Sequence, residues 1–240
     1  TGVVYITADS LYAIEKVFLT MVHETLHGIQ RNSLADKTDM SWSIYDFQAR
    51  VLSTEAAAKV AEYLIALDML HAGNPAPMKG LSDKHPEMTP LIFKTYISAK
   101  KKTQSHAEAL LLTGKDLFYR QFHQRWWVDS YNEDLLKDYV ERIALMQAQP
   151  PSGNAFTLDA LRSTGYISPE FNFTASAEKF PDDLFCGNDG LRQAFAYIEA
   201  ERLAAVFGEK SPAYCEAVKK LKSERNPYAG ISPMLLYMVA

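Results

Sequence analysis

The sequence predicts a mainly α-helical protein with at most a small β element. Apolar residues recur at intervals of three and four along most of the 240 residues, as in helices that bury one face. Only one short run, residues 3–7, is rich in the β-branched and aromatic residues that strands favour. A chain of this length can bury a substantial core, so we expect one large domain or one domain with an extension.

The expected elements follow one another along the chain. After the strand at residues 3–7, Asp9 or Ser10 offers an N-cap for the first helix. Helices are predicted over residues 11–31, 44–71, 89–99, 104–112, 114–148, 189–207 and 211–225. Segments rich in Gly and Pro, 73–77 and 150–154, interrupt this series, and residues 163–188 are predicted to form a long loop. We therefore expect a helical core over residues 1–150 and a helical extension, packed on it, over residues 151–240.

Composition excludes several classes of function. The net charge is -4 and the isoelectric point about 5.9, so no basic surface for nucleic acid is indicated. No stretch reaches the ~20 apolar residues of a membrane-spanning helix. Two cysteines, Cys186 and Cys215, are too few for a disulfide framework or a cysteine zinc site. Because the chain begins at Thr1, we expect that an N-terminal piece has been removed, and both a cytoplasmic and a secreted bacterial location remain open.

Residues 23–27 read His-Glu-Thr-Leu-His, an H-E-x-x-H motif within the first predicted helix. Histidines four residues apart lie one above the other on a helix, so His23 and His27 can bind one metal ion. Glu24 projects at a different angle, toward a metal-bound water whose proton it can take. The competing interpretation is two solvent-facing histidines without a role, since chance yields the motif in about one such chain in a hundred.

A zinc site needs a third protein ligand. The extended motif with a third histidine would place it at position 33, which is Ser33. A carboxylate of a later helix is therefore expected, and Glu55 is the best candidate, because the alanines at 56–58 would let its helix approach the first one, helped by Gly28 from the other side. Glu62, Asp46 and Asp39 are the alternatives, and an exposed helix glutamate is the competing interpretation of Glu55.

This combination resembles the gluzincin branch of zinc metallopeptidases. With Gln30 after the motif and a glutamate-alanine cluster in the next helix, it is similar to uncharacterised bacterial metallopeptidase-like domains. The resemblance covers residues 5–70 and implies a zincin-like domain with Zn²⁺ at His23, His27 and Glu55 and with Glu24 as general base. Many gluzincins carry an aspartate four residues after the ligand glutamate to orient a histidine. Lys59 stands there, so the orienting carboxylate must come from elsewhere, Asp46 or Glu62.

A peptidase also stabilises the oxyanion of its transition state, often with a side chain of a distant segment. The candidates are His106, His123, Tyr131 and Tyr166, and we favour Tyr166, because residues 163–166 lie in a predicted loop that could cover a cleft. The sequence thus predicts a zinc peptidase that cleaves a peptide or protein substrate by direct attack of water. Hydrolysis of a non-peptide amide, or an inactive metal-binding domain that serves as an interaction module, are the alternatives. The oligomeric state is not indicated.

Overall fold

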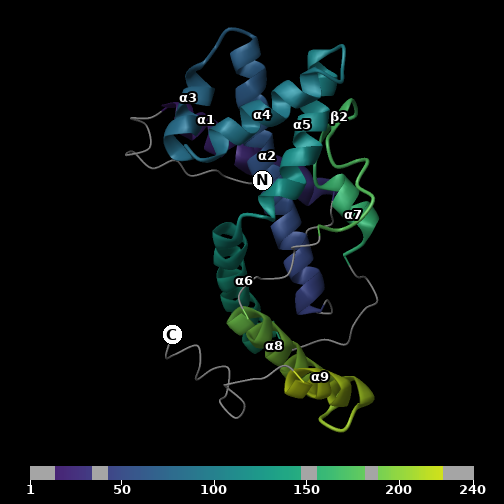
Figure 1. Cartoon of the computed structure of the whole chain (residues 1–240). Coiled ribbons are helices and arrows are strands. Elements are labelled where there is room, and N and C mark those ends of the chain that lie inside the picture. Colours follow the sequence, from purple (N-terminus) through teal and green to yellow (C-terminus); the bar gives the residue numbers. More distant parts are fainter. Residues whose placement is uncertain (1–13, 34–42, 147–155, 182–188, 224–240) are drawn as a thin grey trace. The chain divides into compact units, whose positions relative to one another are not determined.

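A computed structural model describes residues 14–33, 43–146, 156–181 and 189–223 (Figure 1). The predicted mainly α-helical fold with a small β element is confirmed over these residues. The helices are α1 (Ile14–Ser33), α2 (Ile44–His71), α3 (Ala76–Lys84), α4 (Met88–Lys100), α5 (His106–Gln121), α6 (Arg125–Met146), α7 (Leu158–Ser163), α8 (Asp189–Phe207) and α9 (Pro212–Ser223). Strands β1 (Tyr166–Ser168) and β2 (Phe171–Asn172) form an antiparallel hairpin. The predicted strand at residues 3–7 lies outside the described residues.

The contacts divide the chain into two units. Unit 1 contains α1, the part of α2 from Ser53 onward, α3, α4, α5, α7 and the hairpin. Unit 2 contains the start of α2, up to Leu52, with α6, α8 and α9. Helix α2 therefore belongs to both units. None of the described helices is long and apolar enough to cross a membrane.

The part of α2 in unit 1 is buried on nearly every side. Its three consecutive alanines, Ala56 to Ala58, are fully buried, and so are Val60 and the ring of Tyr63. A helix that is apolar around most of its circumference is stable only inside the protein. Helix α1, in the same unit, buries Leu19 and Leu26. The part of α2 that carries Glu55 is therefore a central element of unit 1.

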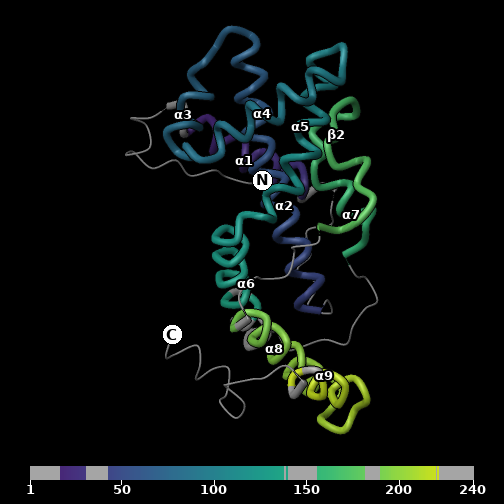
Figure 2. Tube along the Cα trace, in the orientation of Figure 1, coloured from purple at the N-terminus to yellow at the C-terminus, as the bar shows by residue number. Residues whose placement is uncertain are grey.

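Helix α5 runs through the position where a break was expected. We predicted separate helices on either side of Thr113, but α5 continues through Gly114 to Gln121, and the interruption falls before Arg125. Phe173 of the hairpin segment packs on α5 at this glycine, where an added Cβ would lie 2.7 Å from the Phe173 Cβ. Figure 2 shows this later segment, in green, running beside α5. Gly114 thus serves close packing inside a helix and does not end it.

Two other segments differ from expectation. The interruption at 73–77 is shorter than predicted, because α3 begins at Ala76. Its first turn contains a proline, which is tolerated there because the N–H groups of a first helical turn have no partner within the helix. Gly73 supplies the turn before it with a positive φ of 90°. The described part of the long loop expected at 163–188 contains the β1–β2 hairpin. Strands of two and three residues are too short for an alternating pattern to reveal them.

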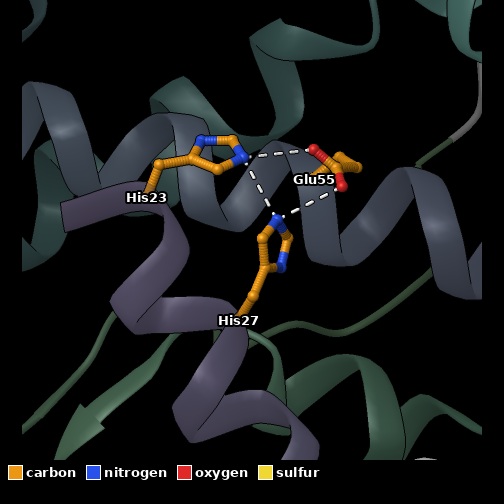
Figure 3. Close-up of side chains that lie close together, drawn as sticks. All are labelled: His23, His27 and Glu55. Atoms are coloured by element: carbon orange, nitrogen blue, oxygen red, sulfur yellow. Dashed lines mark hydrogen bonds and ion pairs between the residues drawn. The ribbon is translucent and has the colours of Figure 1, made fainter. Parts of the chain in front are cut away.

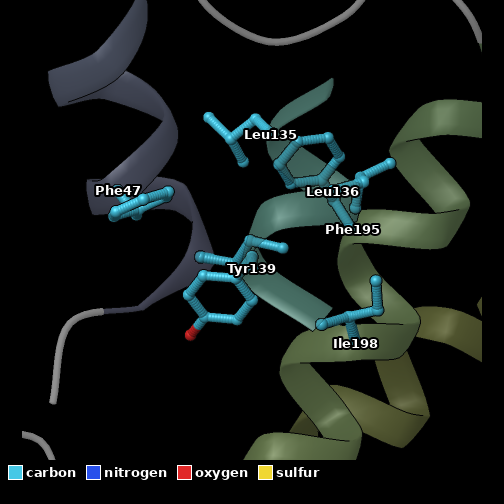
Figure 4. Packing of buried hydrophobic residues seen from close by; sticks show 7 residues of the cluster. Phe47, Leu135, Leu136, Tyr139, Phe195 and Ile198 are labelled. Atoms are coloured by element: carbon cyan, nitrogen blue, oxygen red, sulfur yellow. The ribbon is translucent and has the colours of Figure 1, made fainter. Parts of the chain in front are cut away.

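Unit 2 has its own hydrophobic core, in which side chains of α2, α6 and α8 meet (Figure 4). Its buried members are Ile44, Phe47, Leu135, Leu136, Tyr139, Phe195 and Ile198. The first turn of α2 is fixed there by polar contacts as well. The backbone N–H of Ile44 donates to Glu199 Oε2 at 3.1 Å, and the buried Arg202 pairs with the same carboxylate, its Nη2 2.6 Å from Oε1. The start of α2 is therefore held within unit 2.

Candidate metal centre

Helix α1 presents His23 and His27 toward Glu55 of α2 (Figure 3). The two histidines lie one helical turn apart on one side of α1, while Leu19 and Leu26 on a neighbouring side are buried. His23 Nε2 lies 3.3 Å from one oxygen of Glu55, and His27 Nε2 lies 3.2 Å from the other. The two Nε2 atoms are 3.1 Å apart. Two imidazole nitrogens of α1 and the two carboxylate oxygens of Glu55 in α2 thus lie close together.

These separations fit a metal ion. Zinc binds imidazole nitrogen and carboxylate oxygen at about 2.0–2.1 Å, so neighbouring ligand atoms of a tetrahedral site lie roughly 3.3 Å apart. The separation of the two nitrogens, and that of each nitrogen from one of the two Glu55 oxygens, is 3.1 to 3.3 Å, which is close to this value. Within the part of the chain that the structure describes, His23, His27 and Glu55 are the one group of His, Cys, Asp and Glu side chains that could hold a metal ion together, with one ligand atom from each within 4.8 Å of the others. The choice of Glu55 over Glu62 as the third residue of the group agrees with this geometry.

The second nitrogen of each imidazole is also engaged. His23 Nδ1 lies 2.9 Å from Glu62 Oε1, and His27 Nδ1 lies 2.9 Å from Gln30 Oε1. Both partners are oxygen acceptors, so each Nδ1 carries the proton and donates it. In a neutral imidazole the lone pair then lies on Nε2, which faces the other two members of the group. This is the tautomer that a metal ligand needs, fixed by a neighbouring acceptor as in known metal sites.

Gln30 ties three parts of unit 1 together. Its side chain is almost fully buried, and its Nε2 donates to the carbonyl oxygens of Thr54, at 3.3 Å, and Thr164, at 2.8 Å. Thr54 directly precedes Glu55, and Thr164 lies two residues before Tyr166. One amide therefore orients His27, anchors the backbone next to Glu55 and holds the chain at the start of the hairpin.

The structure selects between the two carboxylates proposed to orient a histidine. Glu62 contacts His23 directly and is only 1% exposed. Asp46 lies in unit 2, where its carboxylate accepts from the Ser43 hydroxyl and the Phe156 N–H. Asp39, an alternative for the third ligand, lies outside the described residues. Of the two proposed carboxylates, Glu62 is therefore the one that contacts a histidine, and it lies two helical turns after Glu55 on the same face of α2.

The charges around these residues favour a cation between them. In the metal-free protein, burial would lower the pKa of His23, but hydrogen bonds with Glu55 and Glu62 outweigh it and raise the pKa to about 9. Burial alone would raise the pKa of Glu55, but hydrogen bonds with His23 and His27 hold it well below its ordinary value. A protonated imidazole thus supplies a positive charge at the point where the donor atoms converge.

The two predicted catalytic residues are placed differently. Glu24 is exposed and lies about 100° around α1 from His23, next to the three-residue group but not part of it. Tyr166 is half-buried and is the first residue of β1. Its neighbour Ile167 lines an apolar pocket of about 230 Å³ against α1. The α1 residues of that pocket lie on the side of the helix away from the histidines, so the catalytic role of Tyr166 stays a prediction.

The other candidates for the oxyanion have partners elsewhere. His106 lies 2.8 Å from the Tyr96 hydroxyl and 2.9 Å from Asp68 Oδ1, and its ring stacks on that of His71. Tyr131 of α6, in unit 2, packs against Trp127. His123 is exposed just after α5. The side chains of His106 and Tyr131 are thus engaged with residues outside the three-residue group.

Gly28 near the site differs from expectation. It was expected to allow a close approach of α2, but it is exposed and an added Cβ would meet nothing within 4 Å. That expectation is wrong, because Gly28 lies on the outer side of α1. His85, which directly follows α3, is half-buried and lies 3.3 Å from Lys59 Nζ.

Comparisons of the chain with protein-family models, with curated proteins and with solved structures found no match. The case for a function therefore depends on the chemistry of the residues themselves.

Proposed function

We propose that this chain is a zinc-dependent peptidase whose metal is held by His23, His27 and Glu55. The observation that carries the proposal is the convergence of two Nε2 atoms and a carboxylate within 3.1 to 3.3 Å, with both Nδ1 atoms already occupied. Two imidazoles and one carboxylate are the protein ligands of a well-known class of catalytic zinc sites. The resemblance of residues 5–70 to gluzincins supports the same assignment.

The chain's own residues would divide the work as follows. Zinc bound to this group would supply a Lewis acid that polarises a peptide carbonyl and acidifies a water molecule. Glu24, next to the ligands but not among them, takes the proton of the attacking water and passes it to the leaving amine. Glu62 and Gln30 keep the imidazoles in their tautomers. Peptides or proteins are the proposed substrates.

The metal content of the purified protein tests the proposal. We expect about one zinc per chain by mass spectrometry in the wild type, and a loss of zinc in His23→Ala and Glu55→Ala. His71→Ala is the matched control, because it removes an imidazole outside the group. Zinc retained in Glu55→Ala would remove this residue from the ligand set, and a wild type that takes up no added zinc would refute the metal site.

Glu24→Gln separates a peptidase from an inactive metal-binding module. The substitution keeps the size of the side chain and removes the base, so the variant should bind zinc as the wild type does and lose cleavage of a peptide library. Removing such a base typically lowers the rate about 10²–10⁴-fold. Absence of cleavage by the wild type would favour the inactive module, and cleavage unchanged by Glu24→Gln would contradict the role of Glu24 as general base.

A further inference from the structure

Lys59 adds a positive charge to the surroundings of the candidate zinc site. It lies one helical turn after Glu55 on α2, with its side chain only 13% exposed. Its Nζ lies 3.0 Å from Glu62 Oε1 and 3.3 Å from His85 Nε2. The first of these contacts joins Lys59, through Glu62, to the imidazole of His23. Lys59 is therefore connected to His23, a proposed metal ligand, by way of Glu62.

The carboxylate of Glu62 needs a positive partner. It is 1% exposed, and Oε1 takes both of its hydrogen bonds, from His23 and Lys59, while Oε2 is buried without a hydrogen-bond partner among the described residues. A buried carboxylate without a counter-charge destabilises the fold. Lys59 and His23 both hydrogen-bond this carboxylate, and Lys84 is a further positive charge near it. Of the two hydrogen-bonded partners, Lys59 is the one that is not a proposed metal ligand, so the lysine supplies a counter-charge to Glu62 that stabilises the metal-free protein.

The same lysine opposes binding of a metal ion. With neutral imidazoles, Glu55 and Glu62 contribute two negative charges, which would balance the two positive charges of zinc. Lys59 neutralises one of them and leaves the loaded site with an excess positive charge. Because opposite charges strengthen binding and like charges weaken it in partly buried surroundings, this excess lowers the affinity for zinc.

We propose that Lys59 is a positioning residue that holds the Glu62 carboxylate on His23 and lowers the affinity of the site for zinc by balancing the charge of that carboxylate. The inference depends on the proposed zinc site and extends it. A site with this balance is stable when empty and releases its metal more readily than one backed by an unpaired carboxylate.

Zinc affinities measured by competition with a chromogenic chelator test this inference. Lys59→Met should bind zinc on the order of ten-fold more tightly than the wild type, because the substitution removes a positive charge that opposes the metal ion in partly buried surroundings. Lys59→Arg keeps the positive charge and should therefore bind zinc with the wild-type affinity. Lys79→Met, which removes an exposed lysine of α3, is the control for net charge and should match the wild type.

A double substitution identifies Glu62 as the partner. Glu62→Gln keeps an acceptor for His23 Nδ1 but has no charge to balance, so adding Lys59→Met to it should leave the zinc affinity unchanged. Lys59→Met should also lower the melting temperature of the metal-free protein, and this loss should shrink in the Glu62→Gln background.

Three results would overturn the inference. Lys59→Met could bind zinc no more tightly than Lys79→Met, or its effect could persist in the Glu62→Gln background. In either case zinc binding itself, and with it the proposed function, would stand. A wild type that binds no zinc would refute both together.

Discussion

The two histidines of the candidate site are held by chemically different partners. His23 donates to a carboxylate, Glu62, and His27 donates to a neutral amide, Gln30. Unlike a carboxylate, the amide also donates hydrogen bonds, and Gln30 Nε2 donates to the carbonyl oxygens of Thr54 and Thr164. Gln30 therefore both orients His27 and binds two backbone segments. Substitutions can separate these two roles.

We expect Gln30→Leu to weaken zinc binding about 10- to 100-fold, as is typical when the partner of a metal-binding histidine is lost. It should also destabilise the fold by about 1–3 kcal/mol, because buried carbonyl oxygens lose their donor. Gln30→Glu keeps an acceptor for His27 but cannot donate to Thr54 or Thr164. It should lose a similar amount of stability and much less zinc affinity. Chelator competition and urea unfolding measure the two effects, and equal zinc affinities for both variants would contradict the role assigned to His27 Nδ1.

At the level of residues, the sequence predicts the relative positions of side chains within one helix better than the contacts between two helices. The spacing of His23 and His27 follows from helix geometry alone, and Glu55 could be chosen because alanines follow it. The choice between Glu62 and Asp46 needed the structure, since it depends on which face of α2 meets α1. The contact of Gln30 with Thr164 spans 134 residues and has no local signal in the sequence.

Two glycines within helices have opposite surroundings. Gly28 of α1 has open space where its Cβ would be. At Gly114 of α5 an added Cβ would lie 2.7 Å from the Phe173 Cβ and 2.8 Å from Leu64 Cδ1. The first of these atoms is attached to the backbone and cannot move aside without shifting the hairpin segment.

Gly28→Ala should therefore stabilise the protein by about 0.5–1 kcal/mol, because alanine loses less backbone entropy in a helix and meets no neighbour. Gly114→Ala, the same chemical change, should destabilise it by about 1–3 kcal/mol through overpacking. Chemical denaturation of the two variants beside the wild type gives both values. A stabilising Gly114→Ala would show that the hairpin segment does not pack on α5 in this way.

The elements that were predicted best are those with clear ends. Helix α2 lies between a polar segment and Gly73, and its predicted bounds coincide with the observed ones. The bounds of α8 coincide as well. The prediction failed at Gly114, because glycine is a common helix terminator and only the packing of Phe173 explains why a helix keeps it. It also missed α3, whose nine residues follow Gly73 and Pro75 and contain Pro77 in their first turn.

At the level of the whole molecule, zinc should stabilise one unit directly. The proposed ligands and their partners, His23, His27, Glu55, Glu62 and Gln30, all belong to unit 1. Zinc binding should therefore slow hydrogen exchange of backbone amides in α1, in α2 beyond Ser53 and, through the bond between Gln30 and Thr164, near the hairpin. Amides of α8 and α9 should exchange as before. Mass spectrometry with and without a chelator measures this, and equal protection of α8 and α9 would contradict a purely local effect.

The position of α2 limits how the protein can be divided or recombined. The boundary between the units falls between Leu52 and Ser53, inside this helix, and Glu55 follows three residues after Leu52. A gene fragment that starts at this boundary would encode a helix without its polar N-terminal contacts, beginning less than one turn before a proposed zinc ligand. Exchange of whole units between related genes would cut the same helix. Insertions and deletions should therefore be tolerated poorly here, and the two units are expected to be inherited together.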